Sequence, residues 1–137
     1  MDEKLWNYLR RGKKDVNGWF QRLDAEIIGS ILTFQEQQNI RGSCVEIGVH
    51  HGKSFIPLCM ALNETEQALC VDVFDEQEKN LDSSGKGNLN AFNKNLEKYD
   101  IAPTLVHILQ KSSADVKPED ILALVGPVRF FSVSGPS

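Results

Sequence analysis

The sequence predicts an α/β fold: a three-layer sandwich in which helices cover both faces of a mainly parallel sheet. Four short apolar segments of strand length alternate with segments whose apolar residues recur at helical spacing. Glycine and proline residues mark most of the boundaries between them, and no internal repeat is visible. At 137 residues with 41% hydrophobic content, the chain can bury the core of one domain.

The N-terminal part, residues 1–23, is interpreted as a helical and basic segment that precedes the main domain, residues 24–137. The basic residues considered in this segment are Arg10, Arg11, Lys13 and Lys14. They are interpreted as a solvated face, because a net charge of -4 gives the chain no long-range attraction for nucleic acid or an anionic membrane. We therefore expect neither of these partners.

A first helix is predicted from Asp24, a side chain suited to capping, to about Gln38. The apolar residues that recur on one side of it are Ile27, Ile28, Ile31, Leu32 and Phe34. Gly42 then breaks this pattern, and the apolar run SCVEIG, residues 43–48, predicts the first strand.

A second helix is predicted for KSFIPLCMAL, residues 53–62, which is apolar on most sides and has Pro57 near its first turn. The run ALCVDVF, residues 68–74, predicts the second strand. Residues 75–88 are rich in charge, Ser and Gly without periodicity. They are interpreted as a surface loop that is either a lid or a plain connector.

A third helix is predicted over residues 89–99. Its apolar face is formed by Leu89, Phe92, Leu96 and Tyr99. After Pro103, the sequence predicts a strand at residues 104–110, a helix at 117–125 and a strand at 128–133. Because ligands of parallel sheets bind at the carboxyl ends of the strands, the residues that follow each strand are the candidates for a site.

The stretch VEIGVHHGKS, residues 45–54, includes the end of the first predicted strand and the turn after it. A phosphate-binding loop needs four residues between its glycines, but Gly48 and Gly52 are separated by three. A dinucleotide-binding loop needs a second glycine two positions after the first, where this chain has His50. Both patterns are therefore disfavoured.

Carboxylates near the ends of two strands indicate a different ligand. Glu46 closes the first predicted strand, and Asp72 lies near the end of the second. A carboxylate beside a ligand favours a positive charge there, with a Coulomb term of about 1–4 kcal/mol at a few ångströms. The acidic residue after the second strand can accept hydrogen bonds from ribose hydroxyls. S-adenosylmethionine, a nucleoside that carries positive charge, fits this pair.

The same stretch resembles the first motif of class I S-adenosylmethionine-dependent methyltransferases, especially the O-methyltransferases of catechol and caffeoyl-CoA type. Their pattern E-[IL]-G-x-x-x-G-x-S is matched at Glu46, Ile47, Gly48, Gly52 and Ser54. Asp72 matches the acidic ribose-binding position, and KSSAD, residues 111–115, resembles the loop that meets the adenine. The resemblance covers about residues 24–133 and implies a Rossmann-like sandwich.

The resemblance also implies a role for each matched residue. Glu46 would face the methionine ammonium group, while Gly48 and Gly52 would pass close to the cofactor. Ser54 would help to hold the methionine end, and Ser113 would approach the adenine. The candidate cofactor-binding residues are Glu46, Gly48, His50, Gly52, Lys53, Ser54, Asp72 and Ser113. The implied activity is methyl transfer from S-adenosylmethionine to a small-molecule acceptor, at oxygen.

Two departures from the family pattern limit this expectation. Metal-dependent relatives have an Asp after the fourth strand, where this chain has Ser134, so no metal site is expected there. The family has about seven strands in the order 3-2-1-4-5-7-6, and only the first four are predicted here. We expect a fragment of a longer domain or a homodimer through the edge of the fourth strand. The alternative function is a truncated, non-catalytic module, and no catalytic residue is assigned.

Simpler interpretations stay open for several of these residues. Glu46 could close the strand without a ligand, or it could pair with Lys53. His50 and His51 are either exposed loop residues, or groups that touch the cofactor, act as a base or begin a metal site. His107 is interpreted as a structural residue of the third strand.

The cysteines and the hydropathy pattern indicate the surroundings of the protein. Each of Cys44, Cys59 and Cys70 lies in an apolar segment, so we expect buried free thiols in a reducing compartment. No apolar run reaches the roughly 18 residues that a membrane span needs. We therefore expect a soluble, cytoplasmic protein.

Overall fold

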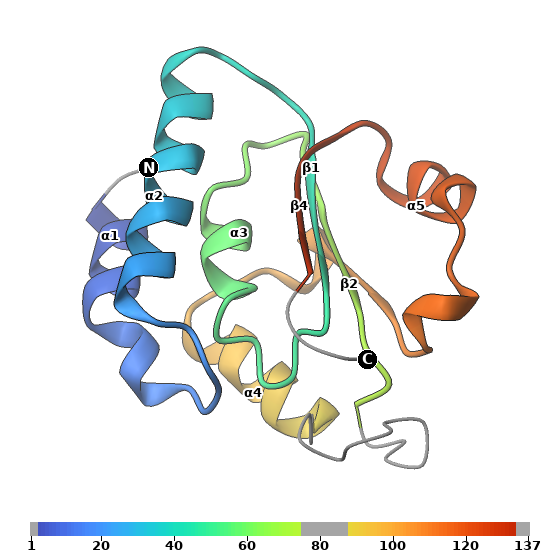
Figure 1. Ribbon diagram of the computed structural model, residues 1–137, viewed down its shortest axis with the longest axis horizontal. Coiled ribbons are helices and arrows are strands. Elements are labelled where there is room, and N and C mark those ends of the chain that lie inside the picture. The colour runs from blue at the N-terminus through green and yellow to red at the C-terminus, as the bar shows by residue number, and fades with distance from the viewer. Residues whose placement is uncertain (1–2, 75–87, 134–137) are drawn as a thin grey trace.

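The computed structural model describes residues 3–74 and 88–133 of the chain. Its strands are β1 (Ser43–Ile47), β2 (Ala68–Val71), β3 (Val106–Leu109) and β4 (Val128–Val133). They form one sheet in the order β3-β2-β1-β4, and every neighbouring pair is parallel (Figure 1). The predicted α/β fold with a parallel sheet is therefore confirmed.

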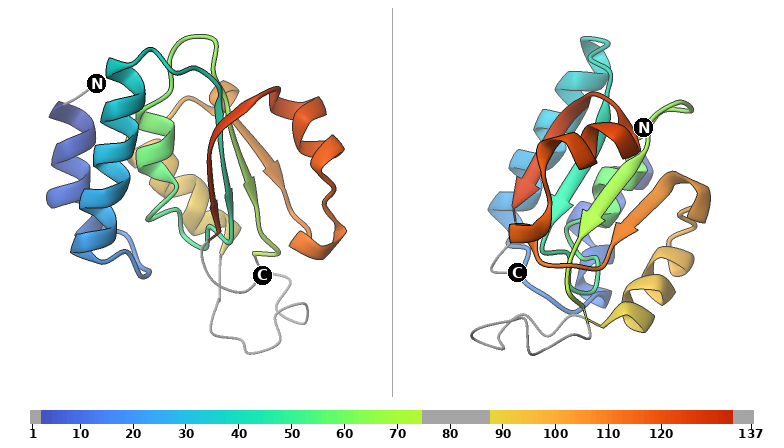
Figure 2. Two further views of the ribbon diagram at one scale, coloured as in Figure 1. Left: turned by 45° about the horizontal axis from the view of Figure 1, so that its top comes forward. Right: turned by 90° about the vertical axis from the view of Figure 1, so that its right-hand side faces the viewer.

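Helices cover both faces of the sheet, as Figure 2 shows. One face carries α1 (Glu3–Arg10), α2 (Arg22–Gln37), α3 (Ile56–Met60) and α4 (Leu89–Lys98). The other face carries α5 (Pro118–Val125). Short 3-10 helices are found at Gly12–Asp15, Pro103–Leu105 and Ser113–Asp115. The arrangement is the predicted Rossmann-like, three-layer sandwich.

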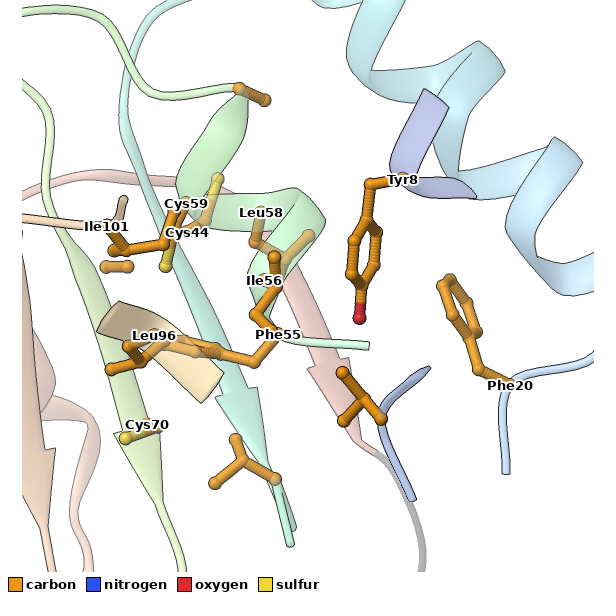
Figure 3. Packing of buried hydrophobic residues seen from close by; sticks show 14 of the residues in the cluster. Tyr8, Phe20, Cys44, Phe55, Ile56, Leu58, Cys59, Cys70, Leu96 and Ile101 are labelled. Carbon is orange, nitrogen blue, oxygen red and sulfur yellow. The ribbon is translucent and has the colours of Figure 1, made fainter. Parts of the chain in front are cut away.

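Each face of the sheet has its own apolar cluster. The larger one lies under α1 to α4 and includes side chains from α1, α3, β1 and β2, several of which are labelled in Figure 3. On the α5 face, Val45, Leu69 and Val71 pack against Ile121 and Val125. The three cysteines, Cys44, Cys59 and Cys70, are buried free thiols, as the sequence predicts.

The predicted helix at residues 53–62 is shorter than expected, because α3 begins only at Ile56. Pro57 has no N–H group, so the carbonyl of Lys53 lacks the donor that a continuous helix would supply. The Tyr8 hydroxyl donates to this carbonyl instead, at 2.5 Å. Tyr8 thereby joins α1 to the turn before α3.

The N-terminus of the first predicted helix differs from the prediction, because α2 begins at Arg22. Gln21 is the N-cap residue of α2 and makes no capping bond through its side chain. Asp24 lies within the first turn, so the prediction that Asp24 caps the helix was wrong. A carboxylate in the first turn still interacts favourably with the helix dipole.

The buried residues of α2 are Ala25, Gly29, Leu32 and Gln35, and of the predicted isoleucines only Ile28 packs partly against the core. A Cβ atom on Gly29 would lie 2.6 Å from Trp6 and 2.7 Å from Leu9, so the glycine permits the close approach of α1. Part of the predicted apolar stripe is exposed. The exposed members of that stripe are Ile27, Ile31 and Phe34, whereas Leu32 is fully buried.

A buried ion pair lies at the amino ends of the strands. Arg129 donates to Glu66 at 3.1 Å, and the two side chains are only 3% and 4% exposed. Glu66 also accepts hydrogen bonds from the backbone N–H groups of Gly42 and Asn63, each at 2.8 Å. The β1–β4 register shifts here, so Arg129 has no paired residue in β1. The Arg129 side chain also donates to Gln35 of α2.

Residues 75–87 of the predicted loop lie outside the described residues, and so does Ser134.

Candidate functional site

The candidate site lies where the strand order reverses. The chain runs outward from β1 through β2 to β3 and then returns to the opposite side of β1 as β4. At such a switch point the loops after the two adjacent strands diverge, which leaves a crevice at their carboxyl ends. Glu46 of β1 pairs in register with Ser132 of β4 at this point.

The turn after β1 depends on two glycines. Gly48 and Gly52 have φ angles of 82° and 92°, a range that residues with a side chain rarely adopt. A Cβ atom on Gly52 would also lie 3.2 Å from the Phe92 ring. The two glycines let the turn pack tightly over β1 and α4, which is the geometry that a close approach to a ligand requires.

Glu46 is the central polar group of the site. Its side chain is fully buried, and the Ser54 hydroxyl lies 2.9 Å from both carboxyl oxygens. Burial raises the pKa of Glu46 to about 8, although hydrogen bonds from Ser54 and Ser132 act in the opposite direction. Asp72 contributes a further increase through charge repulsion. No ion pair joins Glu46 to a basic side chain within residues 3–74 and 88–133.

A cavity of about 310 Å³ opens onto Glu46. Its walls come from the segment before α2, from α2, from the ends of β1 and β4, and from the turn after β1. The lining residues are Trp19, Phe20, Asp24, Ile27, Ile28, Glu46, Ser54, Ser132 and Val133. An apolar wall with one buried carboxyl group and two hydroxyls suits a ligand that has both an aliphatic part and a positive charge.

Asp72 follows β2 and holds the neighbouring turn. One carboxylate oxygen accepts from the backbone N–H of His50, and the other accepts from that of Phe74, each at 2.8 Å. Both donors have unusual positive φ angles, 50° for His50 and 51° for Phe74. Asp72 is only 2% exposed. It therefore stabilises two strained backbone positions, and its binding of ribose stays a prediction.

Lys53 does not pair with Glu46. Its amine donates to the carbonyl of Gly18 at 3.0 Å, so the interpretation of a Glu46–Lys53 pair was wrong. The amine of Lys53 thus contacts the segment that precedes α2. A direct contact of Lys53 with a cofactor stays a prediction.

The remaining predicted residues lie in the turn after β1, and in or after β3. His50 is part of the turn itself, and the carbonyl of His51 accepts from Asn95 of α4 at 2.9 Å. Ser113 starts the 3-10 helix after β3, and β3 is separated from β1 by β2. His107 lies in β3 and contacts Gln67 at 2.5 Å. The structure thus brings Glu46 and Ser54 into one contact, with Asp72 and His50 beside them.

Sequence analysis missed the far wall of the cavity. Ser132 faces Glu46 because β4 returns beside β1, and Phe20 and Trp19 reach the cavity from the segment before α2. A signal for Ser132 was present, since it is a polar residue among the apolar residues of the fourth strand. Its partner could be found only from the strand order.

Comparison with known proteins gives no further assignment. No protein-family model matches the chain, and no curated protein sequence matches it. No helix within the described ranges combines the length and apolar character needed to cross a bilayer. The part of the chain that the structure describes also has no group of three or more His, Cys, Asp or Glu residues placed to hold a metal ion.

Proposed function

We propose that this chain binds S-adenosylmethionine and transfers its methyl group to a small-molecule acceptor at oxygen. The observation that carries this proposal is Glu46: a fully buried carboxyl group, without a basic partner among the described residues, on the wall of a cavity at the switch point. Such a group favours a ligand that brings its own positive charge. The methionine ammonium group of S-adenosylmethionine supplies that charge.

The same geometry argues against a phosphate ligand. A phosphate beside Glu46 and Asp72 would meet two carboxyl groups, and the amine of Lys53 is bound to Gly18. The turn after β1 has one residue fewer between its glycines than a phosphate-binding loop needs. Mg-ATP is therefore the appropriate negative control for binding.

The residues of this chain act mainly by binding and orientation. In the proposed complex, Glu46 and Ser54 hold the amino-acid end of the cofactor, and the apolar wall at Phe20 and Ile28 excludes water from it. S-adenosylmethionine supplies an activated methyl group on its sulfonium. The protein fixes the direction in which that group faces the acceptor, and such orientation accounts for much of the rate of a transfer between two bound molecules.

A non-catalytic module is the second candidate, and the exposed apolar surface favours it. Phe131 and Val133 of β4 are 50% and 67% exposed. On the other face of the sheet, α2 is hydrogen-bonded to β4 through Gln35 and also has exposed apolar residues (Figure 2). Under this proposal, β4 pairs with a second copy of the chain. Light scattering would detect the dimer, and Phe131→Lys would convert it to a monomer if the edge is the contact.

Calorimetric titration tests the proposed cofactor. We expect S-adenosylmethionine and S-adenosylhomocysteine to bind, and Mg-ATP and NAD not to bind. Glu46→Gln should weaken binding of the first pair about tenfold or more, because it removes a Coulomb term of about 1–4 kcal/mol. The matched control is Glu26→Gln, the same change at an exposed glutamate. A folded protein that binds neither sulfur nucleoside would overturn the proposal.

Asp72→Asn is a less useful variant for this purpose. The two oxygens of Asp72 hold the backbone at His50 and Phe74, so an amide would leave one of these N–H groups without an acceptor. A loss of binding in that variant could come either from a lost contact with the ligand or from a disturbed backbone at His50 and Phe74. Glu46→Gln avoids this difficulty because Glu46 accepts only from hydroxyl groups in the described structure.

A further inference from the structure

Glu46 is in an unfavourable position for a negative charge. Its carboxyl group is fully buried, and its hydrogen bonds come from the neutral hydroxyls of Ser54 and Ser132. An isolated carboxylate in such surroundings takes up a proton, because burial favours the neutral form over the charged one.

The groups that surround Glu46 include Asp72, which strengthens this effect by charge repulsion. They are Tyr8 of α1, Asp24 of α2, Cys59 of α3, Cys70 of β2 and Asp72 after β2, with Ser132 on β4. None of them is a cation, and two are acidic. Burial raises the pKa of the Tyr8 hydroxyl and of the Cys59 and Cys70 thiols, so these three groups stay neutral at physiological pH.

Building on the proposed function, we propose that binding of the ligand's ammonium group releases one proton from Glu46 to the solvent. In the free protein Glu46 is a neutral carboxylic acid that shares hydrogen bonds with the two serines. In the complex it is a carboxylate paired with the ammonium group, which keeps all three of its own protons. The only bond that breaks is the O–H bond of Glu46.

This proton release makes ligand affinity depend on pH. Below a pKa of about 8, only a fraction of the free protein has Glu46 in the ionised form that pairs with the ligand. The apparent affinity is reduced by that fraction, so it should rise about tenfold for each unit of pH between pH 6 and 7. Above the pKa of Glu46 this dependence should level off.

The direct test counts the protons released on binding. We would titrate the protein with S-adenosylhomocysteine by calorimetry at about pH 6.5, where its amine stays protonated. Running the titration in two buffers with different ionisation enthalpies separates proton release from the heat of binding. The control ligand is 5′-methylthioadenosine, which keeps the nucleoside but lacks the amino-acid part. The control protein is Glu46→Gln.

We expect close to one proton released per S-adenosylhomocysteine bound, none for 5′-methylthioadenosine, and none for Glu46→Gln with either ligand. Binding of S-adenosylhomocysteine without proton release would overturn this inference and leave the proposed function intact. Release that persists in Glu46→Gln would also overturn it, because another group would be the source. If neither sulfur nucleoside binds, the proposed function fails and this inference fails with it.

Discussion

Two buried glutamates lie at opposite ends of the sheet, and they differ in what surrounds them. Glu66, at the amino ends of the strands, accepts from Arg129 and from two backbone N–H groups. Glu46, near the carboxyl end of β1, accepts from serine hydroxyls alone in the described structure. Burial by itself would raise both pKa values. At Glu66 the bonds from Arg129, Asn63 and Gly42 outweigh burial and lower the pKa, whereas at Glu46 burial prevails.

This difference separates a structural carboxylate from a candidate binding group. Glu66 has every partner that it needs within the protein, and it joins β1, β4 and the segment before β2 into one unit. Glu46 has a cavity where a cationic partner would be. An ionisable group that is buried without a charged partner, and whose pKa is strongly shifted, is an indicator of function where it lies in a pocket.

The largest expected effect comes from breaking the complete pair. Arg129→Met should lower the free energy of unfolding by about 3–5 kcal/mol, because it leaves the Glu66 carboxylate buried without its cation. Urea denaturation at pH 7 measures this loss. The double variant Arg129→Met with Glu66→Gln should recover part of it, since the amide carries no charge. A loss below about 1 kcal/mol in the single variant would mean that the pair is not a determinant of the fold.

The second prediction concerns the opposite pH dependence of the two sites. Glu46 has a folded-state pKa raised to about 8 from an ordinary value of 4.5, so its contribution to stability is present below pH 4.5 and lost as pH rises towards 8. The wild type should therefore lose about 3 kcal/mol relative to Glu46→Gln between pH 5 and pH 8. Glu66, with a lowered pKa, contributes stability that is lost as pH falls.

Unfolding curves of the wild type and Glu46→Gln across this pH range provide the measurement. The alkaline loss should disappear in the variant, while the acidic loss from Glu66 should remain. Parallel pH profiles for the two proteins would mean that Glu46 is already ionised in the folded state, and the contrast between the two glutamates would then be lost.

The sequence was sufficient for the fold because the information was local. Apolar runs such as residues 68–74 and the periodic residues of α4 depend on neighbours in sequence, and their elements begin where predicted, although β2 ends three residues earlier, at Val71. The errors arose where contacts between residues that are distant in sequence determine the structure. Gly29 lets α1 pack on one side of α2, while Ile27 of the predicted apolar stripe is exposed. Tyr8 replaces the N–H group that Pro57 lacks before α3.

The site was predictable only in part for the same reason. Glu46, Gly48 and Ser54 belong to one continuous stretch, so their spacing alone indicated a shared site. Ser132 lies far along the chain and reaches Glu46 only because β4 pairs with β1. The hydrogen bonds of Asp72 to His50 and Phe74 depend on backbone angles that no residue pattern specifies.

A smaller effect is expected from removing the hydroxyl beside Glu46. Ser54→Ala should destabilise the protein by about 2 kcal/mol above pH 8, where the hydroxyl supports a charged group, and by less at pH 5. The pKa of Glu46 should rise further, because the Ser54 bond lowers it. Denaturation curves at both pH values measure this difference. Ser54→Thr keeps the hydroxyl and should keep the wild-type pH dependence; an equal loss at both pH values in Ser54→Ala would contradict the assigned bond.

The smallest effect tests whether the contribution of Glu66 to stability depends on the burial of its ion pair or on the pairing alone. Glu26 pairs with Arg10 at 3.3 Å, the same chemistry as Glu66 with Arg129, but its side chains are 60% exposed at Arg10 and 41% exposed at Glu26. Water screens this pair, and Arg10 keeps its contact with the Trp6 ring when the carboxylate is removed. Glu26→Gln should therefore change the free energy of unfolding by less than about 0.5 kcal/mol, and high salt should abolish even that difference. A loss above about 1 kcal/mol would show that a guanidinium–carboxylate pair stabilises this fold without burial, and the special position of Glu66 would then need another explanation.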